Sequence, residues 1–145
     1  MRARQIAAGG AARQSVAPNI EEVDFLETRA LREAIHAREG GRCFYCMRRV
    51  KAALRCIDHV VPQVHGGGNS YRNLVSSCMG CNAQKRELRA EDFLRWLYRE
   101  GRLSEVELKG RLRAAEEVAA GKLRPALCVK ARKKRDFSLH GLRSK

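Results

Sequence analysis

The chain has 145 residues, a length that fits one compact domain or a small core with extensions. Three prolines and twelve glycines exclude collagen-like and low-complexity classes, and an apolar content of 44% is ordinary for a globular protein. Thirty lysines and arginines against sixteen acidic residues give a net charge of +14, which favours a polyanionic partner over a merely solvated surface. The sequence shows neither a membrane-spanning run nor the apolar stretch of a signal peptide, so we expect a cytoplasmic protein.

The charge is unevenly distributed and divides the chain into five parts. Residues 1–18 carry a net charge of +3 and are expected to be a disordered basic arm. Residues 19–41 carry a net charge of −3 and are expected to form an N-terminal helix. A core at residues 42–89 carries +7, C-terminal helices at 90–121 carry −1, and a basic tail at 122–145 carries +8. The basic core and tail are the parts expected to meet nucleic acid.

In chain order, the first predicted element is an amphipathic helix over residues 20–38, with Asn19 as its N-cap and Gly40-Gly41 at its end. The β-branched residues within 55–61 then predict a strand, which we expect to form a hairpin with residues 47–50. A glycine-rich stretch at 66–70 predicts a loop.

Three helices are predicted in the second half of the chain. The first is short and runs from Cys78 to about Leu88, and the other two are amphipathic and cover residues 90–98 and 105–120. Ser104 and Glu107 are spaced as a capping box for the last helix. The aromatic and aliphatic residues at helical spacing in the middle helix are expected to be core, and they are Phe93, Trp96, Leu97 and Tyr98.

Four of the six cysteines stand in two CxxC pairs, and these are Cys43/Cys46 and Cys78/Cys81. In a chain expected in the cytoplasm, such pairs indicate a metal site rather than disulfides. Four thiolates can hold one tetrahedral Zn²⁺, and a site closed by four cysteines is structural because no open position remains for a substrate. Cys56 and Cys128 lie outside the pairs and are expected to be small hydrophobic residues.

Further motifs lie between and beside the cysteine pairs. The run reads Cys43-Phe-Tyr-Cys46, Ile57-Asp58-His59-Val-Val-Pro62, Gly66-Gly-Gly-Asn-Ser-Tyr-Arg-Asn73-Leu74 and Cys78-Met-Gly-Cys81-Asn82-Ala-Gln-Lys85. This order of motifs resembles the HNH endonuclease family in its zinc-stapled form, with Asn at the third signature position. The resemblance covers about residues 42–88. It implies an α+β fold, with a small ββα-metal core and a four-cysteine zinc site, flanked here by α-helices.

The resemblance also implies a role for each signature residue. His59 corresponds to the general base that activates the attacking water, and Asp58 to a carboxylate ligand of the catalytic divalent ion, Mg²⁺ or Mn²⁺. Asn73 corresponds to the residue that fastens the loop and holds the histidine ring in place. Asn82 corresponds to the second protein ligand of the catalytic ion.

These residue types suit phosphodiester hydrolysis on chemical grounds. Histidine can accept a proton from water near neutral pH. A divalent ion held by only a carboxylate and an amide oxygen keeps open positions for phosphate oxygens. Asn82 directly follows a zinc ligand, so the structural zinc would fix the helix that presents it.

Basic side chains near the core and in the tail are the predicted contacts to nucleic acid. Lys85 and Arg86 follow Asn82 closely and are expected near the same helical face. The basic run of the tail supplies Lys130, Arg132, Lys133, Lys134 and Arg135. His65 is open to two interpretations, a phosphate contact or a solvated loop residue. His36 and His140 are expected to be structural or exposed.

The sequence therefore predicts an enzyme, a metal-dependent endonuclease that nicks or cuts duplex DNA. Two alternatives stay open: a non-catalytic zinc-ribbon or treble-clef module that binds nucleic acid, and a nuclease that acts mainly on RNA or single strands. The combination of Asp58-His59, Asn73 and Asn82 favours an enzyme over a binding module, which has no need of it. The sequence does not indicate the target site or the oligomeric state.

Overall fold

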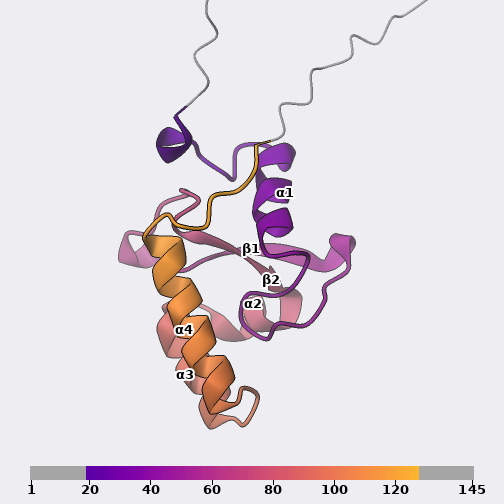
Figure 1. Ribbon diagram of the computed structural model, residues 1–145, viewed down its shortest axis with the longest axis vertical. Helices are drawn as coiled ribbons and strands as arrows, with labels where there is room; N and C mark the ends of the chain where they lie inside the picture. The colour runs from indigo at the N-terminus through magenta and orange to yellow at the C-terminus, as the bar shows by residue number, and fades with distance from the viewer. Residues whose placement is uncertain (1–18, 128–145) are drawn as a thin grey trace, which may run out of the picture.

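The computed structural model describes residues 19–127, which form a small antiparallel sheet surrounded by helices (Figure 1). The main elements, in chain order, are α1 (Arg29–Arg38), β1 (Arg55–His59), β2 (Leu74–Cys78), α2 (Met79–Lys85), α3 (Ala90–Arg99) and α4 (Glu105–Ala119). The order β1, β2, α2 is the ββα core expected from the resemblance, and the α+β class is confirmed. Across residues 19–127, no helix is both long enough and apolar enough to cross a membrane.

The register of the sheet decides where the signature residues lie. Arg55 pairs with Cys78 at one end of the sheet, and His59 pairs with Leu74 at the other. The sheet therefore separates the cysteines of the β2–α2 junction from the Asp58-His59 end of β1. The loop of residues 60–73, which includes the glycine-rich stretch, joins the two strands at the Asp58-His59 end.

The predicted hairpin between residues 47–50 and 55–61 is wrong. Residue Arg49 makes only an isolated bridge with Arg42, and the partner of β1 is the later segment Leu74–Cys78. The first four residues of β2 are all buried, and its sequence, Leu-Val-Ser-Ser-Cys, does not alternate apolar and polar residues as a half-exposed strand does. The sequence pattern therefore does not predict this strand.

The predicted N-terminal helix begins nine residues later than expected. Asn19 does act as a cap, but only for a 3₁₀ turn over Ile20–Glu22, and α1 itself is capped by the Thr28 side chain. Between them, Phe25 is completely buried and its backbone N–H donates to the carbonyl of Asn69 at 3.0 Å. This tertiary contact holds the chain in a non-helical path that local propensity did not reveal.

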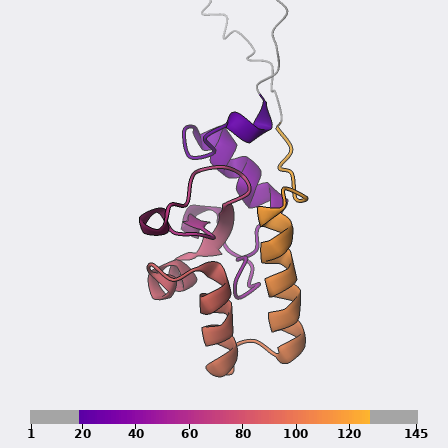
Figure 2. The ribbon, with the colours of Figure 1, turned by 90° about the vertical axis from the view of Figure 1, so that its left-hand side faces the viewer.

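The two C-terminal helices are confirmed and form an antiparallel pair, seen side by side in Figure 2. Ser104 and Glu107 make the predicted capping box at the start of α4. Phe93 and Leu97 are buried in the main core, and Trp96 stacks on Phe93 at a centroid distance of 5.6 Å. Tyr98, also expected in the core, is exposed.

The helix predicted from Cys78 to Leu88 ends at Lys85. Arg86 has a positive φ of 50°, which turns the chain away from the helix axis. Residues 1–18 and 128–145 lie outside the described residues, and with them the predicted N-terminal arm, Cys128, His140 and the five predicted contact residues of the tail.

His36 is a buried structural residue of α1. Its Nδ1 atom lies 2.6 Å from the Ser76 hydroxyl on β2, so it joins the helix to the sheet. Burial lowers its pKa below the ordinary 6.5, Glu33 opposes this effect, and Arg55 and Arg32 reinforce it. The folded protein therefore favours the neutral imidazole.

This burial predicts a pH-dependent stability. The unfolded state binds a proton at His36 more readily than the native state, so stability should fall as the pH drops through the ordinary pKa of histidine. His36→Gln removes that contribution. Compared with wild type, its free energy of unfolding should fall less between neutral and mildly acidic pH, by at most about 1.4 kcal/mol per pH unit. Urea titrations at several pH values measure both slopes, and identical slopes would contradict the prediction.

Candidate metal centre and catalytic site

The two CxxC pairs meet in space as one cluster of sulfur atoms. The ligand atoms of Cys43, Cys46, Cys78 and Cys81 all lie within 4.8 Å of one another, and the Cys46 and Cys78 sulfurs are 3.9 Å apart. A tetrahedral site with Zn–S bonds of about 2.3 Å requires sulfur–sulfur distances on the order of 3.8 Å. The donor set and its spacing therefore fit a structural zinc ion.

Local backbone geometry brings the two pairs together. The first pair sits on a tight turn in which Met47 adopts a φ of 62° and its N–H donates to the Cys43 carbonyl at 2.9 Å. In the second pair, Cys78 ends β2 and its sulfur also caps α2 by accepting from the Cys81 N–H at 3.3 Å. A metal bound here joins the turn of the first pair to the junction of strand and helix.

The crowding of the thiols makes their ionisation interdependent. The pKa of Cys46 is lowered to about 2 because the thiols of Cys43 and then Cys81 donate hydrogen bonds to its thiolate. The same bonds raise the pKa values of those two donors, that of Cys43 to about 11. A divalent cation removes this competition, since it favours the thiolate form of all four ligands.

At the other end of the sheet, Asp58 has a buried carboxylate that is held on one side. Its Oδ2 atom accepts a hydrogen bond from the Tyr45 hydroxyl and lies 3.0 Å from the Lys85 ammonium. Within residues 19–127, no hydrogen bond reaches Oδ1, and Oδ1 is not among the fully buried atoms that lack a partner. Oδ1 therefore has no hydrogen-bond partner among the described residues and is not fully enclosed, so it can accept a ligand.

His59, the next residue along β1, is held by the glycine-rich loop. Its Nε2 atom lies 2.9 Å from Oδ1 of Asn69, a residue that sequence reasoning did not single out. Asn69 is in turn 3.2 Å from a carboxylate oxygen of Asp24. An asparagine within a glycine-rich loop is typical of a turn, so its sequence carried no signal of this contact.

Asn73 closes the same loop from its far end. Its Oδ1 accepts from the Val61 N–H at 2.8 Å, and its Nδ2 donates to the carbonyls of Val61 and Gly68 at 3.0 and 2.9 Å. A Cβ atom at Gly67 would lie 1.7 Å from the Val61 carbonyl oxygen, so only glycine fits there. The loop is thus tied to the chain just beyond β1, two residues after His59.

Asn82 lies on α2 one residue after Cys81 of the thiol cluster, and it is exposed. Asp58 and His59 therefore lie at the end of β1 and Asn82 lies on α2, two elements that pack against each other, whereas Asn73 lies in the loop directly before β2.

Comparison with protein families identifies the central part of the chain. Residues 43–87 match the family described as HNH endonuclease. This segment is an HNH domain. A comparison of the chain with curated proteins returned no match. The matched segment contains all four zinc cysteines and the four signature residues, whereas α1, α3 and α4 lie outside it.

Lys85 of the HNH domain differs from its predicted role. It was expected to contact phosphates, but it is only 1% exposed. Its ammonium pairs with Asp58 and donates to the His59 carbonyl at 2.8 Å. The lysine therefore binds α2 to the end of β1 from the inside. Arg86 does not share its helical face, because the chain turns at that residue, and the exposed Arg86 side chain remains a predicted phosphate contact.

His65 lines an open hollow of about 550 Å³ beside α2. Its Nε2 donates to the Glu87 carbonyl at 3.2 Å, and its side chain is exposed. Arg86 lines the same hollow, which keeps a phosphate contact at His65 as a prediction.

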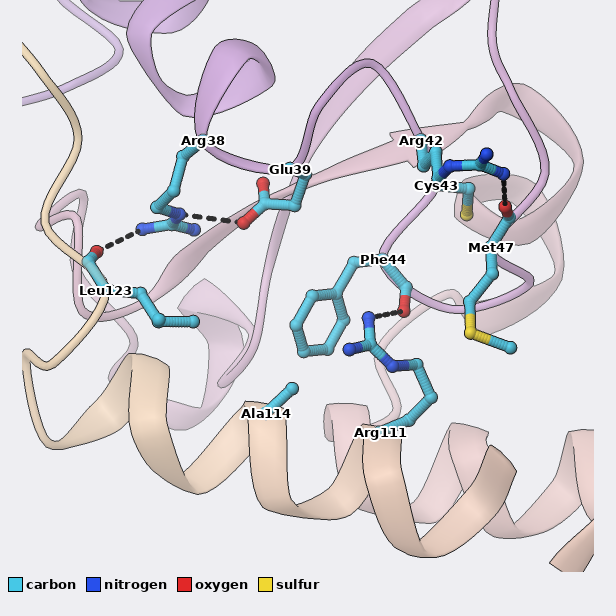
Figure 3. A pocket seen from close by; sticks show the side chains of 9 residues that line it. All are labelled: Arg38, Glu39, Arg42, Cys43, Phe44, Met47, Arg111, Ala114 and Leu123. Atoms are coloured by element: carbon cyan, nitrogen blue, oxygen red, sulfur yellow. Dashed lines mark hydrogen bonds and ion pairs between the residues drawn. The ribbon is translucent and has the colours of Figure 1, made fainter. Parts of the chain in front are cut away.

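A second hollow, of about 450 Å³, lies between α4, the end of α1 and the turn of residues 43–47, here called the zinc turn (Figure 3). Its charged groups are already paired: Arg38 contacts Glu39 at 2.7 Å, and Arg111 donates to the Phe44 carbonyl at 3.1 Å. Burial raises the pKa of Glu39, although Arg38 opposes this effect. These contacts attach α4 to the zinc turn and indicate a structural role for this region.

The zinc cluster predicts different behaviour for cysteines inside and outside it. Cys43→Ser should lose the metal and much of the fold, because metal binding and folding are coupled in small zinc domains. Cys56→Ser is the matched control, since Cys56 lies on β1 outside the cluster. Elemental analysis and circular dichroism measure the outcome. A Cys43→Ser protein that keeps wild-type zinc content and melting temperature would contradict the assignment.

The buried pair between Lys85 and Asp58 predicts a large effect on stability. Lys85→Met leaves the carboxylate without its cation, which should lower the free energy of unfolding by about 3–5 kcal/mol. Lys51→Met removes the same charge from an exposed position and should change stability little. Urea unfolding of the zinc-loaded proteins compares them. Equal stability of the two variants would show that the pair contributes nothing.

Proposed function

We propose that this chain is a metal-dependent endonuclease that hydrolyses phosphodiester bonds of DNA, with duplex DNA as its substrate. The observation that carries the proposal is that Asp58 and His59 are adjacent at the end of β1 in an HNH domain, each with one side-chain atom already hydrogen-bonded. Among residues 19–127, no hydrogen bond reaches the other atom of either side chain, Oδ1 of Asp58 and Nδ1 of His59, so both can act on a ligand.

His59 is the proposed general base. Because Nε2 is hydrogen-bonded to Asn69, Nδ1 is the nitrogen left to take a proton from the attacking water. The closed loop limits movement of the ring, and Asn73 contributes by fastening that loop. A base held in one orientation is more effective than a mobile one.

Asp58 and Asn82 are the proposed ligands of a divalent ion, Mg²⁺ or Mn²⁺. The donor set fits such an ion, since a carboxylate oxygen and an amide oxygen are the hard ligands it prefers. Oδ1 of Asp58 has no hydrogen-bond partner among residues 19–127, and Asn82 is exposed. When bound, the ion would neutralise charge on the phosphate and on the departing oxygen. Lys85 compensates part of the charge of Asp58 from within the core.

The substrate assignment is supported by charge. Residues 42–89 carry a net charge of +7, which favours a nucleic acid over a neutral or cationic substrate. The pairing of a candidate base with a candidate metal ligand favours cleavage over binding alone. Duplex DNA, single-stranded DNA and RNA are the three substrates to compare directly.

The proposed base predicts loss of chemistry without loss of binding. His59→Ala should lower the single-turnover cleavage rate of plasmid DNA by at least about 100-fold, while zinc content and DNA affinity stay near wild type. Val64→Ala is the control because Val64 is an exposed apolar residue of the loop after β1 with no predicted contact to substrate or metal, and it should retain the wild-type rate. Cleavage by His59→Ala at the wild-type rate would overturn the assignment.

The two metals should respond differently to a chelator. Brief treatment with EDTA should stop cleavage by removing the ion held by two protein ligands, and Mg²⁺ or Mn²⁺ should restore it. The zinc held by four thiolates should stay bound during this treatment, as elemental analysis can verify. Undiminished cleavage in EDTA, with zinc still bound, would contradict a catalytic divalent ion.

A further inference from the structure

The hydrogen bonds around His59 extend beyond the ring to a carboxylate on a distant segment. Nε2 of His59 lies 2.9 Å from Oδ1 of Asn69, and Nδ2 of the same amide lies 3.2 Å from Oδ2 of Asp24. Three side chains therefore form one line, from carboxylate through amide to imidazole. Asp24 lies outside residues 43–87, the part of the chain that matches the HNH family.

The chemistry of this line fixes the direction of every hydrogen bond. A carboxylate only accepts, so the Asn69 nitrogen must face Asp24 and donate to it. The Asn69 oxygen then faces His59 and can only accept, so Nε2 must carry the proton. A neutral imidazole protonated at Nε2 keeps the lone pair on Nδ1. The carboxylate of Asp24 therefore selects the tautomer of the histidine through one amide.

Asp24 is itself held in place. Its second oxygen, Oδ1, accepts from the Leu26 N–H at 2.8 Å, so both carboxylate oxygens are used. The neighbouring residue, Phe25, is completely buried, and its N–H donates to the backbone carbonyl of Asn69 at 3.0 Å. The Asp24 side chain and the Phe25 backbone therefore both bind Asn69 of the loop.

Glu21, three residues before Asp24, binds the same loop. The Glu21 carboxylate accepts from the guanidinium of Arg72 at 2.8 and 3.0 Å and from the hydroxyl of Tyr71 at 2.6 Å. The hydrogen bonds from Arg72 and Tyr71 lower the pKa of Glu21 to about 2. The segment before α1 therefore packs along the loop from residue 69 to residue 72, and this contact explains why residues 20–28 do not continue as a helix.

We propose that Asp24 and Asn69 are positioning residues of the nuclease, which orient His59 and hold it in the Nε2-protonated tautomer. This inference rests on the proposed role of His59 as the base. It assigns a role in the reaction to a segment outside the HNH domain. Neither residue touches the reacting atoms in this arrangement; both act through the imidazole.

The first test reads the tautomer without any cleavage. In ¹⁵N-histidine-labelled protein at a pH of about 8, where imidazoles are neutral, the nitrogen shifts of His59 should show the proton on Nε2. The His59→Ala spectrum identifies the signal. Asn69→Ala should give a mixture of the two tautomers in a protein that still binds zinc. An unchanged Nε2-protonated signal in Asn69→Ala would overturn the proposal.

The second test is kinetic. Asn69→Ala and Asp24→Asn should each lower kcat for DNA cleavage, Asn69→Ala by about 10- to 100-fold, and leave KM for DNA near wild type. Glu22→Gln is the matched control for Asp24→Asn, since it removes the same charge from an exposed position in the same segment. Equal kcat values for wild type and Asn69→Ala would contradict the proposal.

A double substitution separates positioning from general damage to the fold. Asn69→Asp alone places two carboxylates against each other and should lower kcat. Adding Asp24→Asn supplies an amide at position 24 that can accept from Leu26 and donate to the new carboxylate, so all three hydrogen bonds return. The pair should recover most of the kcat lost by Asn69→Asp. No recovery, in a double variant as stable as wild type, would contradict the proposal.

The outcomes also distinguish the two levels of inference. If the wild-type protein and every variant fail to cleave nucleic acid, the proposed function fails, while the nitrogen shifts still test the relay from Asp24 to His59. If wild type cleaves and His59→Ala does not, but Asn69→Ala and Asp24→Asn behave as wild type, the proposed function stands and the positioning role is wrong.

Discussion

Four cysteine thiols, placed closely enough to share one metal ion, set the geometry of this protein. The cysteines come from a turn before the sheet and from the junction of β2 with α2, and their sulfurs lie within 4.8 Å of one another. Without a cation, the same crowding forces the thiols to compete for protons. With one, the turn, the strand and the helix become a single rigid unit. A small two-stranded sheet is not stable alone, so the rest of the fold depends on this cluster.

Helix α2 connects the thiol cluster to the Asp58-His59 end of the sheet. Within seven residues it presents Cys81 to the metal cluster, Asn82 to solvent and Lys85 to the core. The start of α2 is held by Cys78 and Cys81 of the thiol cluster. Its end is held by Lys85, whose ammonium contacts both the Asp58 carboxylate and the His59 carbonyl. A buried ion pair is costly to desolvate, and it persists here because the ammonium has two oxygen partners. This pair holds the end of β1 against the helix.

The sequence predicted the parts of the fold that depend on local chemistry. The cysteine spacing indicated a metal cluster, and the capping box at Ser104 marked the start of α4. Predictions failed where a distant contact overrides local preference. β2 is buried along most of its length and lacks alternation, and the segment around Phe25 is drawn out of a helix by its contact with Asn69.

The candidate site divides in the same way. The order of motifs pointed to Asp58, His59, Asn73 and Asn82, whose roles remain a proposal. The burial of Lys85 was not predicted, because its position one turn after Asn82 resembles a solvent-facing phosphate contact. Asp24 and Asn69 could not be paired from sequence, since 45 residues separate them and each is an ordinary turn residue by itself.

Incorporation of oxygen from water during DNA cleavage tests the central claim most directly. The zinc-loaded 145-residue chain is incubated with duplex DNA and Mg²⁺ in water enriched in oxygen-18, and the terminal phosphate formed at each cut is analysed by mass spectrometry. We expect cleavage with a single labelled oxygen in each new terminal phosphate, because a water activated by His59 becomes part of the product. Tight DNA binding with no cleavage under Mg²⁺ or Mn²⁺ would instead identify a binding module, and cleavage without the label would exclude direct hydrolysis by water.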